Sequence, residues 1–141
     1  MSVTLNAYIR FDGTARQAME FYKSVLGGEL RMSTFKEGMG SQDPSDENKI
    51  MHAQLDSEGM TLMGSDVPTG MNIKPGNNIG LSLSGEDETK LKDYFEKLSA
   101  GGNVTVKLEK APWGDTFGMF IDKFGIDWMV NIRSAENAKQ N

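Results

Sequence analysis

The chain has 141 residues, a formal net charge of −5 and no cysteine, so it can form a folded domain but no disulfide, thiolate metal site or cysteine nucleophile. The acidic balance and the scattered basic residues argue against binding to nucleic acid or to an anionic membrane, which both require clustered Lys and Arg. No apolar run reaches the roughly 20 residues of a spanning helix, and residues 1–13 do not have the pattern of a signal peptide. We therefore expect a cytoplasmic protein without a membrane segment.

The first half of the chain predicts one helix among four strands, at about 3–11, 29–35, 49–56 and 60–66. The helix follows from apolar residues at helical spacing, which are Ala15, Ala18, Met19, Tyr22, Val25 and Leu26. We predict that Thr14 and Gln17 form a capping box at its start and that Gly27 and Gly28 end it.

The second half predicts the same order, with strands at about 78–84, 104–109, 116–122 and 126–133. Its helix carries an apolar stripe of Leu91, Tyr94, Phe95 and Leu98 and ends before Gly101 and Gly102. Three segments fall outside this pattern. We expect 36–48 to be a mobile loop, 67–77 to join the halves, and 134–141 to be a frayed tail.

The two halves also match in sequence, which indicates an internal repeat. The polar and apolar order of 6–13 matches that of 78–85 at a spacing of 72 residues, and an aromatic pair precedes a glycine pair in both helices. The chain therefore predicts an α+β fold of two βαβββ modules, at about 3–66 and 78–133.

Three strings carry a resemblance to a known family: Phe21–Gly28, Lys49–Ala53 and Trp113–Phe120. With the repeat, they make the chain similar to the vicinal oxygen chelate superfamily, which includes glyoxalases, bleomycin resistance proteins and dioxygenases, and most of all to its PhnB-like branch. The resemblance implies a single domain over 1–141. It also implies a curved, partly open mixed sheet around a cavity, helices on the outer face, and a homodimer.

Enzymes of this superfamily hold a divalent metal with His and Glu side chains that face the cavity. The resemblance places the corresponding positions at Asn6, Met63, Asn78 and Met129. Neutral amides and soft thioethers are poor ligands for hard or borderline divalent ions, so we expect no metal. We also expect no other cofactor, since glycine-rich nucleotide motifs and the glycine motif of methyl-donor binding are missing.

Strand alternation adds polar candidates in the first module. His52, the only histidine, shares a strand face with Gln54, and Asn6 shares one with Tyr8 and Arg10. We expect the more polar faces to line the cavity. His52 suits a general acid, a general base or a hydrogen-bonding group, and the alternative is a partly buried histidine with a purely structural partner.

In the second module the same alternation turns Asn78 and Ser82 inward. Trp113, Phe117 and Met129 belong to an aromatic and methionine-rich group suited to a flat apolar ligand or to core packing. Matching the repeats directs Phe120 to the cavity, whereas the family pattern favours Phe117, which we prefer.

Two functions compete. One is a metal-independent protein that binds a small molecule. The other is a glyoxalase-like or dioxygenase-like enzyme that acts on a small oxygenated substrate, with His52 as acid, base or non-standard metal ligand.

Overall fold

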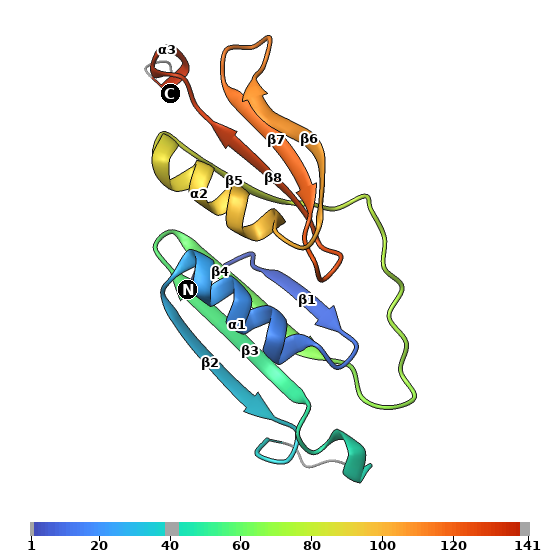
Figure 1. Ribbon diagram of the computed structural model, residues 1–141. Coiled ribbons are helices and arrows are strands. Elements are labelled where there is room, and N and C mark those ends of the chain that lie inside the picture. The colour runs from blue at the N-terminus through green and yellow to red at the C-terminus, as the bar shows by residue number, and fades with distance from the viewer. Residues whose placement is uncertain (1, 39–42, 139–141) are drawn as a thin grey trace. The chain divides into compact units, whose positions relative to one another are not determined.

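The computed structural model describes residues 2–38 and 43–138, and the chain divides between Lys74 and Pro75 into two compact units. Each unit contains one four-stranded mixed sheet and one long helix (Figure 1). The predicted α+β fold of two βαβββ modules is confirmed, and each module builds a sheet of its own. The organisation as a single domain stays a prediction.

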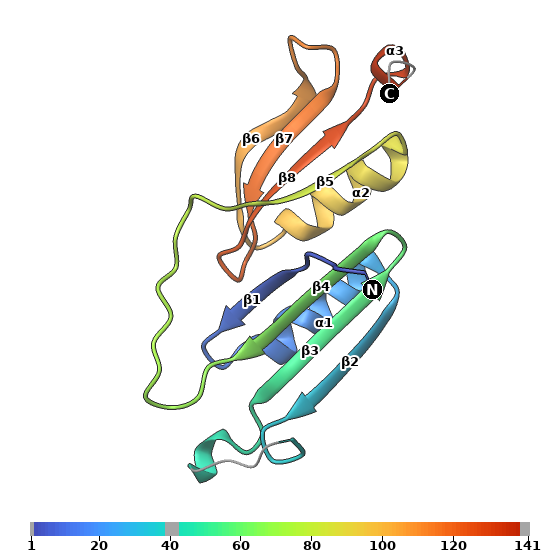
Figure 2. The ribbon, with the colours of Figure 1, turned by 180° about the vertical axis from the view of Figure 1, so that it is seen from behind.

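The first unit has the strand order β1-β4-β3-β2, with β1 parallel to β4 and the other pairs antiparallel. Helix α1 covers one face of this sheet (Figure 2). The elements are β1 (Ala7–Phe11), α1 (Ala15–Leu26), β2 (Glu29–Thr34), the 3₁₀ helix η1 (Pro44–Asp46), β3 (Ile50–Ser57) and β4 (Met60–Asp66).

The second unit repeats this topology with the order β5-β8-β7-β6 and a parallel β5–β8 pair. Its elements are β5 (Leu81–Gly85), α2 (Glu88–Ser99), β6 (Asn103–Lys110), β7 (Thr116–Ile121), β8 (Asp127–Ile132) and the short α3 (Ala135–Ala138). The first strand of each module is shorter than predicted, because its pairing begins only where Ala7 meets Leu62 and Leu81 meets Trp128.

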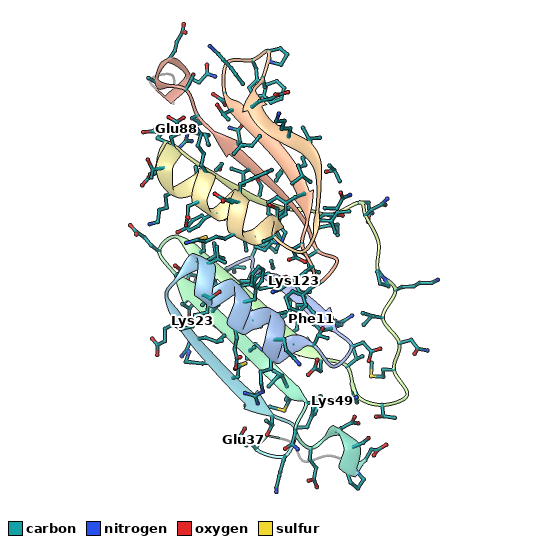
Figure 3. All side chains as sticks on the ribbon, in the orientation of Figure 1. Phe11, Lys23, Glu37, Lys49, Glu88 and Lys123 are labelled. Atoms are coloured by element: carbon teal, nitrogen blue, oxygen red, sulfur yellow. The ribbon has the colours of Figure 1, made fainter. Side chains whose placement is uncertain are left out.

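The core of each unit lies between the helix and the sheet. In the first unit the Phe11 side chain, labelled in Figure 3, and Met19 flank Gly64. A Cβ atom on Gly64 would lie 3.1 Å from the Phe11 ring. In the second unit the Phe95 ring of α2 meets the Phe120 ring edge-on at 5.1 Å, and Phe120 stacks on Trp128 at 6.2 Å. These contacts place Phe120 on the helix side of its sheet.

The start of α1 differs from the prediction. Thr14 makes no side-chain capping hydrogen bond. Instead, the buried carboxylate of Asp66 accepts hydrogen bonds from Ala15 N and Ile50 N, both at 2.9 Å. The expected capping box is therefore wrong, because a carboxylate at the end of β4 satisfies the helix terminus from 51 residues away.

The described parts of the segment 36–48 are held by the Asp46 carboxylate. It accepts hydrogen bonds from Thr69 N at 2.9 Å and Thr69 Oγ1 at 2.7 Å, and it pairs with Lys49 Nζ at 2.9 Å. Residues 39–42 of the predicted mobile loop lie outside the described residues.

The predicted frayed tail is ordered up to its short helix. Ser134 N and Asn137 Nδ2 both donate to the carboxylate of Asp115, at 2.9 and 2.6 Å. These two hydrogen bonds hold the segment against the start of β7, so the expectation of a frayed end is wrong for 134–138, and 139–141 lie outside the described residues. Within 2–38 and 43–138, no helix has the length and apolar character to cross a membrane.

Candidate functional site

The first sheet has one face against α1 and an opposite face that carries the predicted polar residues. Strand register places Tyr8 of β1 beside Met63 of β4, Met63 beside Gln54 of β3, and Gln54 beside Arg31 of β2. Side chains of directly paired residues lie on the same face. One row of side chains therefore crosses all four strands, and His52 adjoins it on β3.

Tyr8 and His52 form a pair on this face. Tyr8 Oη lies 3.2 Å from His52 Nδ1, and the ring centroids are 5.7 Å apart. The Tyr8 side chain is 47% exposed, while His52 is half-buried. The pair brings a phenol and an imidazole together from positions 44 residues apart, which gives this face both a proton donor and a proton acceptor.

A second polar cluster surrounds Asp56, farther along β3. Its carboxylate accepts from Gln54 Nε2 at 3.0 and 3.2 Å, from Thr61 Oγ1 at 3.0 Å and from Arg31 Nη2 at 2.9 Å. These bonds, led by that of Gln54 and followed by those of Thr61 and Arg31, hold the pKa of Asp56 below its usual value. Asp56 is therefore an anion at neutral pH, with its charge compensated by neighbouring donors.

The sequence prediction of the site did not include Asp56 or Arg31. Asp56 could have been found by extending the alternation that joined His52 and Gln54, since it is the next residue on that strand face. Arg31 could not have been found in this way, because it lies on another strand and depends on the β2–β3 register.

The second sheet presents its own row of predicted residues on the face away from α2. Ser82 of β5 pairs with Met129 of β8, which pairs with Met119 of β7. Phe117 lies two residues before Met119 on the same face, and Trp113 meets its ring at 5.5 Å. Since Phe120 packs against α2, Phe117 is the aromatic residue of β7 that faces away from the helix.

Asp115 fixes the turn that bears Trp113. Its carboxylate is 7% exposed and accepts from Asn131 Nδ2 at 2.9 Å, in addition to Ser134 and Asn137. Asn137 also donates to the carbonyl oxygen of Trp113 at 3.0 Å. These hydrogen bonds, the one from Asn131 first, lower the pKa of Asp115. The exposed Trp113 side chain thus stands on a backbone that is held in place.

The four positions that the resemblance assigns to the superfamily's metal carry side chains that do not fit a divalent ion. Met63 and Met129 are thioethers within strands, while Asn6 and Asn78 precede β1 and β5. In the part of the chain that the structure describes, no three His, Cys, Asp or Glu side chains are grouped as a metal site would need. This donor set offers neither the charge nor the imidazole nitrogen that such an ion requires.

Comparison with known proteins identifies the family. A family model described as 3-demethylubiquinone-9 3-methyltransferase matches residues 4–131. The chain belongs to the PhnB-like branch of the vicinal oxygen chelate superfamily. The resemblance stated from the sequence is thereby confirmed.

Several relatives of this PhnB-like chain are similar over nearly their whole length. Protein YjdN of Escherichia coli is 31% identical over 140 residues, which covers 91% of this chain and 94% of YjdN. The crystal structure of protein PA1353 from Pseudomonas aeruginosa matches with a TM-score of 0.83 and 34% identity. The match covers 94% of this chain and 98% of the PA1353 chain. A PhnB protein from Bacillus cereus matches with a TM-score of 0.77 and 25% identity, and it is described as a putative 3-demethylubiquinone-9 3-methyltransferase. The match covers 93% of this chain and 100% of the Bacillus cereus chain.

Proposed function

We propose that this PhnB-like protein binds a small molecule on the face of its first sheet away from α1. The observation that carries the proposal is the Tyr8–His52 pair, which stands beside Met63 and Gln54 on a face that α1 does not cover. Ligand sites commonly combine apolar surface with a few polar groups of fixed orientation. Here Met63 and the Tyr8 ring supply apolar surface, and His52 and Gln54 supply the polar groups.

Two further parts of the proposal concern other positions. In the second unit, Phe117, Met129 and Ser82 of the sheet and Trp113 of the turn before β7 are proposed as contacts of a ligand on that unit. Asn6 and Asn78, ahead of the first strand of each unit, are proposed as further contacts within their own units. Binding is proposed to be independent of a divalent metal, and the support is the neutral and soft character of Asn6, Met63, Asn78 and Met129.

One observation favours a second candidate, an enzyme that acts on a small oxygenated substrate. The hydrogen-bonded phenol of Tyr8 can orient the His52 imidazole and exchange a proton with it, as an acid or base pair requires. The family's description as a methyltransferase is not carried over, because the chain has no glycine motif for a methyl donor.

We further propose a homodimer in the cytoplasm. Each sheet has two edge strands, which are β1 and β2 in the first and β5 and β6 in the second. On β6, Val104 and Val106 are 45% and 42% exposed. Uncovered edges invite pairing with another chain, and a two-fold dimer is the commonest way to cover such a surface.

The test of ligand binding is a thermal-shift screen of small oxygenated compounds, with and without EDTA, followed by titration calorimetry of the hits. His52→Ala should weaken a hit about ten- to hundredfold, which corresponds to about 1–3 kcal/mol for a lost polar contact, without lowering the melting temperature. Glu20→Ala, on the exposed side of α1, is the control and should change nothing. Hits that bind His52→Ala as tightly as the parent would remove the support for this site, and hits that bind only with a divalent ion would contradict metal independence.

A further inference from the structure

The hydrogen bond between Tyr8 and His52 has a preferred direction. In a neutral imidazole one nitrogen donates and the other accepts. A phenol is a stronger acid than a neutral imidazole N–H, and a bare imidazole nitrogen is a stronger base than a phenol oxygen. Tyr8 Oη and His52 Nδ1 are 3.2 Å apart, and the stronger hydrogen bond between them is therefore the one in which the Tyr8 O–H donates to His52 Nδ1. The proton of His52 then resides on Nε2, which becomes a hydrogen-bond donor.

The side-chain amide of Gln54 offers a hydrogen-bond acceptor, whereas His52 offers a donor. An ionised carboxylate accepts hydrogen bonds and donates none, and the lowered pKa of Asp56 keeps it ionised at neutral pH. The Gln54 nitrogen, which donates to both Asp56 oxygens, is therefore held at Asp56. Arg31 and Thr61 bind the same carboxylate and fix it in turn. The Gln54 oxygen is left as an acceptor.

The donor His52 Nε2 and the acceptor Gln54 Oε1 have no hydrogen-bond partner within the described part of the chain. The two residues are neighbours on one strand face, so their Cα atoms lie about 6.6 Å apart. The face thus offers one donor and one acceptor from adjacent positions of the same strand face.

We infer that this face selects small neutral molecules that carry a carbonyl oxygen and a hydroxyl group a few bonds apart, such as hydroxy ketones. His52 Nε2–H donates to the carbonyl oxygen, and Gln54 Oε1 accepts from the hydroxyl. The inference rests on the proposed function, since it assigns a ligand class to that same face.

The same arrangement disfavours anions. A carboxylate at this place would meet the Gln54 oxygen as a second acceptor, with the Asp56 carboxylate behind it. On the row that crosses the four strands, the cation is Arg31, which is already paired with Asp56 at 2.9 Å. Arg10 lies on the same face of β1 but two residues from Tyr8, opposite Ser65, so it is off the row that contains Gln54. Specificity of this kind comes from an unfavourable contact with the wrong ligand as much as from a favourable one with the right ligand.

The first experiment tests the orientation without a ligand. Long-range ¹H–¹⁵N correlation spectra of the histidine-labelled protein report which ring nitrogen carries the proton, and His52 is the only histidine. We expect the Nε2–H form in the parent and a larger share of the Nδ1–H form in Tyr8→Phe. A parent protein with the proton on Nδ1 would overturn the inference while leaving the proposed function intact.

The second experiment tests the ligand class with three named probes: hydroxyacetone, methoxyacetone, which lacks the donor, and lactate, which is an anion. Titrations are followed by the NMR signals of His52 and the Gln54 side chain. Hydroxyacetone should bind about fivefold or more tightly than either of the others, the loss expected for one hydrogen bond.

Asp56→Asn should remove this preference, because the amide that replaces the carboxylate can donate to the Gln54 oxygen and so allow the Gln54 side chain to turn. Glu20→Ala, on the exposed side of α1 and outside this cluster, is the control and should retain the preference. Tighter binding of lactate, or an unchanged preference in Asp56→Asn, would refute the inference alone. If neither these probes nor any hit of the screen perturbs His52 or Gln54, the inference and the proposed function both fail.

Discussion

One glycine after each long helix, Gly28 after α1 and Gly102 after α2, lies close against the backbone of a neighbouring segment. Alanine substitutions at Gly28 and Gly102 therefore test the packing that positions the site. A Cβ atom on Gly28 would meet the carbonyl oxygen of Asp56 and come within 2.8 Å of Ser57 Cα. The equivalent Gly102 would meet the carbonyl oxygen of Ile121 and come within 2.8 Å of the carbonyl carbon of Asp122. In both cases the obstacle is backbone, which cannot turn aside as a side chain can.

The expected destabilisation can be built from two effects. Gly28 has φ +87°, whereas Gly102 is not in the positive-φ region. A non-glycine residue at positive φ costs about 1–2 kcal/mol, and overpacking against fixed atoms costs about 1–3 kcal/mol. Gly102→Ala should therefore lower the free energy of unfolding by about 1–3 kcal/mol, and Gly28→Ala by about 2–5 kcal/mol.

The hairpin glycines provide the controls. Gly59 has φ +70° and Gly125 has φ +85°, and nothing lies within 4 Å of a Cβ built on either. Gly59→Ala and Gly125→Ala should thus show the backbone effect alone, about 1–2 kcal/mol. Urea unfolding with an unchanged m-value measures these differences. If Gly28→Ala is no more destabilising than Gly59→Ala, the close approach to Asp56 is not a constraint and the reasoning fails.

Two other predictions concern acid stability and assembly. Hydrogen bonds to its carboxylate lower the pKa of Asp115, and the bond from Asn131 has the largest effect. The stabilisation that Asp115 contributes is therefore complete above the ordinary Asp pKa of about 3.9, and it is lost as the pH falls from about 3.9 through the lowered pKa. Thermal melts from pH 7 to pH 2 should therefore show a smaller acid-induced loss for Asp115→Asn than for the parent, and equal losses would contradict this. Light scattering at micromolar concentration should give twice the chain mass of 15.5 kDa, and a mass of one chain would refute the homodimer.

The sequence by itself was sufficient for the repeat, for the order of the strands and the two long helices, and for the side-chain alternation within β3. These features depend on local periodicity, since apolar residues at helical spacing mark α1 and α2, and alternation places His52 and Gln54 on one face of β3. The glycine pairs after the helices were also readable, because a helix end that turns away needs a residue tolerant of positive φ.

The tertiary structure alone decided which distant groups meet. Thr14 had the right chemistry to cap α1, yet Asp66 takes that place from the end of β4. The choice between Phe117 and Phe120 required the contact of Phe120 with Phe95. Tyr8 reaches His52 across 44 residues of sequence. Alternation states the face on which a side chain lies, but its partner depends on strand order and register, which arise only when the whole sheet forms.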